Sequence, residues 1–201
     1  MAVLRPMALA SSSETRRKIL ANAGIAFETI KPLLDEEKLK KKLTADGMDG
    51  DALPLALAKA KACDVAENNP GLLVIGADQI LECEGRRFDK PRDVAEAWRQ
   101  LRDLSGKTHS LISAVSIACD DQVIWTYSDR AFLSMRILSA DFMDFYLQTQ
   151  GEKNLCITGL YQLEGLGSQL FLSVEGDFFT TLGLPLFPLL EFFRSQGILE
   201  T

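Results

Sequence analysis

A chain of 201 residues with 47% hydrophobic and 25% charged residues has the composition of one globular domain, with or without two lobes. The 22 basic and 28 acidic residues give a net charge of −6, which argues against broad binding to duplex nucleic acid. No apolar run reaches membrane-spanning length, and Met1–Ser13 lacks a signal-peptide pattern. We therefore expect a cytoplasmic protein without membrane or stable nucleic-acid partners.

The cysteine and histidine content limits the possible chemistry. Cys63, Cys83, Cys119 and Cys156 lie far apart and form no C-x-x-C pair, so we expect reduced thiols rather than a zinc site. His109 is the only histidine, so a serine or cysteine hydrolase would need it as its base. We expect His109 to be a loop residue bonded to backbone rather than a catalytic group.

The N-terminal part predicts a strand at Met7–Ala10, a polar loop at Ser11–Ser13 and a helix over residues 17–23. Such a loop gathers hydroxyls, backbone N–H groups and the positive end of a helix, which suits a phosphate. Arg16 and Arg17 add charge-assisted donors. The alternative is a well-capped surface helix with solvated arginines.

The next segments predict a second strand over residues 26–30 and, after the acids Asp35 and Glu36, a solvated helix face at Lys38–Lys42. A further helix begins at Pro54 and ends at Glu67. Lys61 lies within that helix, where its side chain either binds phosphate or extends along the surface to water.

The stretch Leu72–Leu81 predicts the centre of the fold. Residues 72–75 form a β-branched apolar run typical of a buried strand, and Gly76 is expected to break it before Asp78 and Gln79. Ligand crevices of α/β proteins lie at the ends of such strands. The alternative for Asp78 is a turn residue, after which residues 80–84 continue as strand.

The C-terminal part predicts alternating strands and helices. The expected helices lie at residues 94–104 after Asp93, 141–148 after Ser139, and 188–195; the expected strands lie at residues 110–118, 123–127, 130–137, 155–159 and 169–174.

The polar segments that follow predicted strands or open predicted helices carry similar chemistry. Carboxylates suit a hard divalent cation held together with substrate phosphates, and Arg or Lys suits the phosphates themselves. The chain has neither G-x-x-x-x-G-K-[ST] nor G-x-G-x-x-G, so it predicts neither a P-loop nor a dinucleotide site of that type. Each acid alone is more often solvated than catalytic. The residues concerned are Ser11, Ser13, Arg16, Asp35, Glu36, Asp78, Lys90 and Glu164.

Eight ordered blocks run along nearly the whole chain: L-A-S-S-S-E-T-R-R at residues 9–17, L-D-E at 34–36, A-K-A-K-A at 58–62, I-G-A-D-Q at 75–79, K-P at 90–91, L-S-G with T-H at 104–109, E-G-L-G at 164–167 and G-L-P-L at 183–186. On these blocks the chain resembles the Maf family of nucleoside triphosphate pyrophosphatases, closer to the branch acting on 7-methyl-GTP.

The resemblance implies a Maf- and ITPase-like α/β fold, in which a long twisted mixed sheet lies between two lobes with a central cleft, and a homodimer. It implies hydrolysis of the α–β phosphoanhydride of a nucleoside triphosphate, with Asp78 as general base and Mg²⁺ or Mn²⁺ held by Glu36 and Asp78. The phosphates would be bound by Ser11, Ser13, Arg16, Lys61 and Lys90.

Substrate choice would depend on Thr15, Gln79 and Glu164, where Gln79 and Glu164 resemble the 7-methyl-GTP branch and Thr15 fits neither branch. The alternative substrates are dTTP and UTP. Two residues depart from the family pattern, because Glu14 stands for proline and Asp89 stands for glycine before Lys90.

Two other functions remain to be weighed. A non-catalytic, nucleotide-binding regulator of septum formation would need neither a base nor a metal site. The presence of Asp78, Lys90 and Glu36 therefore counts against this function. A tRNA- or DNA-binding domain is disfavoured by the net charge of −6.

Overall fold

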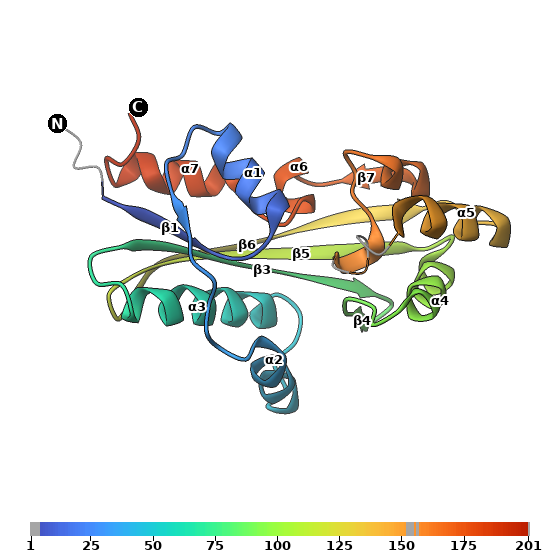
Figure 1. Cartoon of the computed structure of the whole chain (residues 1–201), viewed down its shortest axis with the longest axis horizontal. Coiled ribbons are helices and arrows are strands. Elements are labelled where there is room, and N and C mark those ends of the chain that lie inside the picture. The colour runs from blue at the N-terminus through green and yellow to red at the C-terminus, as the bar shows by residue number, and fades with distance from the viewer. Residues whose placement is uncertain (1–4, 152–154, 156, 201) are drawn as a thin grey trace. The chain divides into compact units, whose positions relative to one another are not determined.

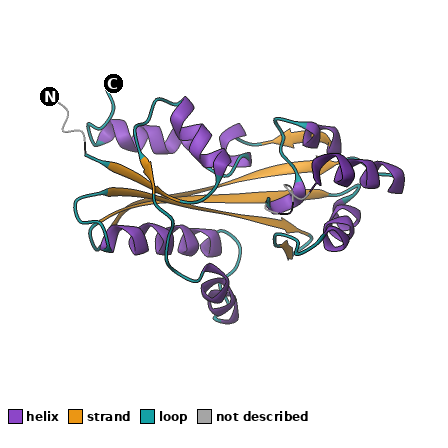
Figure 2. Ribbon diagram, in the orientation of Figure 1, coloured by secondary structure: helices purple, strands orange, loops and turns teal. Residues whose placement is uncertain are grey.

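The mixed sheet is the central feature of the fold. The computed structural model describes residues 5–151, 155 and 157–200, and within them the strands form a seven-stranded sheet in the order β2-β1-β3-β5-β6-β7, with β4 paired to β3 (Figures 1 and 2). The predicted α/β class with a mixed sheet is confirmed. The strands are β1 (Met7–Ala10), β2 (Glu28–Thr29), β3 (Leu73–Cys83), β4 (Arg86–Phe88), β5 (Thr108–Cys119), β6 (Gln122–Met135) and β7 (Phe171–Glu175).

The helices follow the predicted order with small shifts at their ends, apart from the short α6, which was not predicted. They are α1 (Glu14–Asn22), α2 (Glu36–Ala45), α3 (Ala52–Glu67), α4 (Val94–Leu104), α5 (Ala140–Gln150), α6 (Phe178–Thr181) and α7 (Leu186–Ser195). Asp93 and Ser139 cap α4 and α5 as predicted, since each side chain accepts a hydrogen bond from a backbone N–H in the first turn. Helix α1 begins three residues before the predicted start because Ser13 is its cap.

The chain forms two compact units. The first contains the residues up to Gln79, Ile112–Asp129 and those from Phe178 onward, and the second contains Ile80–Leu111 and Arg130–Asp177. Strands β3, β5 and β6 contribute residues to both units. The predicted single domain with a central cleft stays a prediction.

The first unit has helices on both faces of its strands. Alternate residues of a strand point to opposite faces. Met7 and Leu9 accordingly pack with α1 and α7, whereas Ala8 and Ala10 pack with α3. Figure 1 shows this layering, with α3 along one face and α1 and α7 along the other. Small alanines on the α3 side let that helix approach the sheet closely.

The predicted break at Gly76 is wrong, because β3 runs without interruption through Gly76 and Asp78. A Cβ at Gly76 would lie 2.2 Å from the Ala58 carbonyl oxygen and 2.7 Å from the Ala62 backbone nitrogen. The glycine is therefore required by the close approach of α3, and it does not end the strand. Asp78 consequently lies within a strand and is no turn residue.

The second unit has its own apolar core. Residues of α4 and α5 pack there with Leu81, Leu133 and Met135. Strands β6 and β7 pair antiparallel in this unit, and β3 pairs antiparallel with β4 through the turn at Gly85. The same strands, β3 and β5, thus contribute residues to the cores of both units.

Other differences from prediction concern the C-terminal half. The two strands expected at 123–127 and 130–137 are one strand, β6. The strand expected at 155–159 is absent from residues 158 and 159, which lie in a short 3-10 helix (Thr158–Leu160), and Cys156 lies outside the described residues. Cys63, Cys83 and Cys119 are free thiols, as predicted. Across the described part of the chain, no helix combines the length and apolarity needed to cross a membrane.

Candidate active site

Strand β1 ends before β3 does, so β1 does not pair with the part of β3 around Asp78. The two strands are parallel, and Ala10, the last residue of β1, pairs with Gly76. Residues Ala77 to Gln79 therefore extend past β1, and the loop Ser11–Ser13 takes the place of a strand next to them. The position at a strand end that suits a ligand is therefore present, as predicted for Asp78. The strand that ends there is β1, whereas β3 continues.

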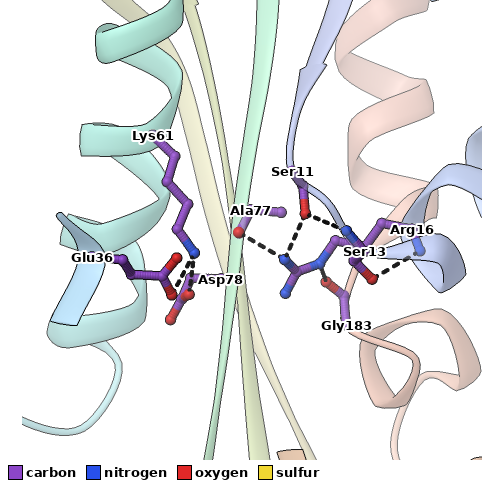
Figure 3. A network of polar contacts seen from close by, with 8 residues as sticks. All are labelled: Ser11, Ser13, Arg16, Glu36, Lys61, Ala77, Asp78 and Gly183. Atoms are coloured by element: carbon purple, nitrogen blue, oxygen red, sulfur yellow. Dashed lines mark hydrogen bonds and ion pairs between the residues drawn. The ribbon is translucent and has the colours of Figure 1, made fainter. Parts of the chain in front are cut away.

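A buried lysine joins two carboxylates at this position. Lys61 Nζ lies 2.7 Å from Asp78 Oδ1 and 2.9 Å from Glu36 Oε1. Asp78 and Lys61 are both buried, whereas the Glu36 side chain is about half exposed. Figure 3 shows the three side chains together on one side of β3, where α3 supplies the lysine. The alternative in which Lys61 extends to water is therefore wrong.

Local structure explains how Glu36 reaches this place. Asp35 caps α2, because its Oδ1 accepts a hydrogen bond from the Lys38 backbone nitrogen at 2.9 Å, and Glu36 is the first residue of that helix. The preceding segment is tied to α3 by a 2.7 Å bond from the Leu33 backbone nitrogen to Asp64 Oδ2. The L-D-E motif thus combines a helix cap with a carboxylate directed at Lys61.

The environment of Asp78 makes its carboxylate a stronger base. Burial raises the pKa of Asp78 above its ordinary value, and the positive charges of Lys61 and Arg16 oppose that rise. A carboxylate whose pKa is raised accepts a proton from water more readily than an exposed aspartate does. Burial, and not a neighbouring charge, is the main cause of the raised pKa of Asp78.

Arg16 is buried against the other side of β3. Its Nη1 donates to the Ala77 carbonyl at 2.9 Å and its Nε donates to the Gly183 carbonyl at 2.8 Å (Figure 3). Burial lowers the pKa of Arg16, which the charges of Asp78 and Glu36 oppose. The picture of a surface helix with solvated arginines is therefore wrong for Arg16. It holds for Arg17, which is exposed and paired with Glu14.

The serine loop is organised by its own hydrogen bonds. Ser11 Oγ accepts from the Ser13 backbone nitrogen at 3.2 Å and from Arg16 Nη1 at 3.4 Å, and Ser13 Oγ accepts from the Arg16 backbone nitrogen at 3.3 Å. Both oxygens act as acceptors, so each hydroxyl proton remains to be donated. Glu14, in place of proline, puts a carboxylate in the first turn, where the helix dipole favours it.

The second unit carries two predicted site residues, Lys90 and Glu164, and both are exposed. Asp89 before Lys90 is not among the described non-glycine residues with positive φ, so its backbone does not require the family's glycine. The Asp89 carbonyl accepts a 3.0 Å hydrogen bond from Gln100 Nε2, which fixes the start of this loop. The substitution therefore adds charge without backbone strain.

His109 is a buried strand residue and does not bond to backbone in a loop as we expected. Its Nε2 lies 2.6 Å from Tyr161 Oη, and the ring is tilted against Phe171. Burial lowers the pKa of His109 to about 4. The imidazole is thus neutral at pH 7 and belongs to the packing of the second unit.

The remaining specificity residues lie near the Arg16 side of β3. Thr15 is half-buried in the first turn of α1, and Gln79 is half-buried in β3. Sequence patterns did not indicate the groups that hold Arg16 and Gln79 in place: the Gly183 carbonyl, which accepts from Arg16, and Ser113 with Thr180 around Gln79. The G-L-P motif at 183–185 was a signal for Gly183, whereas buried serines have no local signature.

Comparisons with known proteins identify the family. A family model described as Maf-like protein matches residues 6–196. The chain belongs to the Maf family. It is 47% identical to the 7-methyl-GTP pyrophosphatase of Rhizobium meliloti (strain 1021), with 96% of each chain covered. It is 48% identical to the nucleoside triphosphate pyrophosphatase of Paramagnetospirillum magneticum, with 94% of this chain and 97% of the relative covered.

A further relative agrees with this assignment. The nucleoside triphosphate pyrophosphatase of Caulobacter vibrioides is 46% identical, with 98% of both chains covered. A solved HAM1 protein from Coxiella burnetii aligns with 65% of this chain and 72% of its own at 14% identity and a TM-score of 0.39, which is too low to support an argument. The family membership therefore rests on sequence.

Proposed function

We propose that this Maf-family protein is a nucleoside triphosphate pyrophosphatase. It hydrolyses the α–β phosphoanhydride and releases a nucleoside monophosphate and pyrophosphate. The observation that carries the proposal is the buried Asp78 carboxylate, paired with Lys61 and lying beside the strand end where the serine loop begins. The names of relatives 46 to 48% identical over nearly the full chain support the same activity.

In the proposed reaction Asp78 is the general base. Its carboxylate takes a proton from water as the water oxygen forms a bond to the α-phosphorus. The bond from that phosphorus to the α–β bridging oxygen breaks, and pyrophosphate leaves with the bonding electrons. Lys61 orients the carboxylate, since its ammonium bonds Asp78 Oδ1 and leaves the second oxygen for the water.

The proposed phosphate ligands are the hydroxyls of Ser11 and Ser13 and the guanidinium of Arg16. Two of the three nitrogens of Arg16 already donate to backbone carbonyls, so its Nη2 is the group to meet a phosphate. The role proposed for Lys90 as a phosphate ligand rests on its K-P motif. Lys61, by contrast, holds carboxylates, which changes the role that the sequence suggested for it.

A divalent cation fits the residues present. Two carboxylates, from Glu36 and Asp78, lie close enough to share one ammonium, and Mg²⁺ or Mn²⁺ prefers such oxygens together with phosphates and water. No group of three or more metal-ligating side chains occurs in the part of the chain that the structure describes, so the substrate phosphates would supply further ligands. When bound, the cation would neutralise phosphate charge and polarise the α-phosphorus.

For the substrate we propose 7-methyl-GTP or a similar modified purine nucleotide. The support comes from Gln79 and Glu164, and from relatives named 7-methyl-GTP pyrophosphatase in Rhizobium meliloti and Rhizobium etli. Methylation makes the purine cationic, and a carboxylate at Glu164 would favour a cation with N–H donors. The predicted homodimer and the cytoplasmic location stay predictions.

Pyrophosphate release tests this proposal. Purified protein is assayed with Mg²⁺ or Mn²⁺ against 7-methyl-GTP, dTTP, UTP, CTP and the common purine triphosphates. We expect the highest kcat/KM for 7-methyl-GTP, its loss in Asp78→Asn, and no effect of Asp121→Asn at an exposed aspartate of the same unit. Preference for dTTP or UTP would reject the substrate, and binding without turnover of any nucleotide would favour a regulator.

A further inference from the structure

The side-chain amide of Gln79 is held in one orientation. Its Nε2 lies 3.0 Å from Ser113 Oγ, 3.1 Å from the Thr181 carbonyl oxygen and 3.3 Å from the Thr180 carbonyl oxygen. Carbonyl oxygens only accept hydrogen bonds, so the amide nitrogen and not the amide oxygen must face them. The network therefore determines which end of the amide is which, a choice that is otherwise ambiguous.

Ser113 is itself constrained to accept from Gln79. It is fully buried in β5, and its Oγ donates its single proton to the Thr180 carbonyl at 2.7 Å. Its lone pairs are consequently the part that faces Gln79. The buried Thr180 is fixed in turn, because its Oγ1 donates to Asp129 Oδ2 at 2.8 Å. The chain of bonds runs from β6 through α6 and β5 to Gln79, all within the first unit.

The other end of the amide points to the Arg16 side of the strand. A Cβ built on Gly183 would lie 3.4 Å from Gln79 Oε1 and 3.5 Å from Arg16 Nε and Nη2. Gly183 has φ of +95° and fills none of this space. Among the described residues no hydrogen bond to Gln79 Oε1 is formed. The oxygen is therefore an acceptor next to the proposed phosphate-binding guanidinium.

We propose that Ser113 and Thr180 are positioning residues that fix the orientation of the Gln79 amide and so let it select the substrate base. They hold its amide so that the carbonyl oxygen, and not the NH₂ group, meets the nucleotide. This selects bases that present a ring N–H donor on the Watson–Crick edge, such as guanine and 7-methylguanine with N1–H. It disfavours adenine, whose N1 is an acceptor. The inference rests on the proposed function for its substrate class.

The first test compares base preference in variants of the supporting residues. Ser113→Ala removes one acceptor and the bond to Thr180, and Thr180→Val removes the bond to Asp129. We expect the ratio of kcat/KM for 7-methyl-GTP over ATP to fall about fivefold, through KM, as the loss of one hydrogen bond predicts. Thr180→Ser keeps a hydroxyl and is expected to restore the ratio. Ser116→Ala, at a fully buried serine of the same strand, is the control.

A second measurement does not depend on turnover. The dissociation constants of 7-methyl-GMP and AMP are measured for the same variants, and the side-chain NH₂ signals of Gln79 are followed by ¹⁵N NMR for protection from solvent exchange. We expect protection in the wild-type protein and in Ser116→Ala, and its loss in Ser113→Ala together with a reduced affinity ratio.

The outcomes separate the two proposals. If no nucleoside triphosphate is hydrolysed by the wild-type protein, the proposed function fails, and the ratio of monophosphate affinities still decides the role of Ser113 and Thr180. If turnover or binding occurs but base preference is unchanged in both Ser113→Ala and Thr180→Val, the positioning role is overturned and the enzyme assignment stands.

Discussion

Lys61 illustrates how one residue can satisfy a motif in a different way from the one expected. Its ammonium bonds two carboxylates, one of them on a buried aspartate, so it compensates charge that would otherwise be costly. Removing one partner of a buried ion pair leaves the other unpaired, which costs more than the pair itself contributes. The lysine is therefore needed for stability as well as for orienting Asp78.

Replacement of this lysine gives a clear expectation. Lys61→Met should lower the free energy of unfolding by about 3 kcal/mol at pH 7, because Asp78 remains buried without its ammonium. The loss should diminish toward acidic pH, where Asp78 is protonated. Lys59→Met, two residues earlier in the same helix, is the matched control and should change stability little. Urea unfolding of the three proteins measures this, and equal losses in both variants would contradict it.

The types of site residue were foreseeable at this scale, but their partners were not. The A-K-A-K-A block at 58–62 marked Lys61 through the family resemblance, and the apolar run before Asp78 in I-G-A-D-Q marked that acid. That the two side chains meet depends on α3 packing directly over Gly76. Arg16 was chosen for its charge, yet its burial depends on the distant carbonyl of Gly183.

At the scale of secondary-structure elements, the helices were predicted better than the strands. Asp93 and Ser139 are caps with a local chemical signature, and α4 begins and ends where it was predicted. Strand β3 was interrupted too early at Gly76, because a glycine that admits a helix looks the same in sequence as one that ends a strand. The long β6 was divided at Ser128 and Asp129, because a polar pair inside a strand looks like a turn in sequence.

The pair of His109 and Tyr161 links strand β5 to the segment that precedes Glu164. The two side chains are buried, and their hydrogen bond is formed by a neutral imidazole. A Cβ at Gly167 would lie 2.5 Å from the Gln162 carbonyl oxygen, so this segment is folded tightly behind Tyr161. Protonation of His109 would place an uncompensated charge in this core.

This pairing predicts how stability depends on pH. The pKa of His109 is about 4 in the folded protein and 6.5 ordinarily, so the unfolded chain binds more protons between these values. The free energy of unfolding should therefore fall as pH is lowered, by about 2 kcal/mol between pH 7 and pH 5 from this residue. Urea unfolding at both pH values measures the fall. His109→Gln should reduce it, and an unchanged fall in the variant would argue against a buried neutral imidazole.

At the scale of the whole molecule, the family resemblance implied the mixed α/β fold with one long sheet, whereas local patterns predicted only individual strands and helices. The pairing of β1 with β3, and the early end of β1, were not predictable from local patterns, since they depend on contacts between residues 66 positions apart. Those contacts place the serine loop beside Asp78. The motifs thus identified the residues of the candidate active site, and the strand pairing brings them together.

The central claim is that Asp78 is the base of an α–β phosphoanhydride hydrolysis. The most direct test is ³¹P NMR of the products formed from the preferred nucleoside triphosphate by the wild-type protein and by Asp78→Asn, with unfolding measured on both. The account predicts nucleoside monophosphate and pyrophosphate from the wild type, and a rate lower by about 10² to 10⁴ in a folded Asp78→Asn protein. Formation of nucleoside diphosphate and orthophosphate, or an undiminished rate in Asp78→Asn, would contradict it.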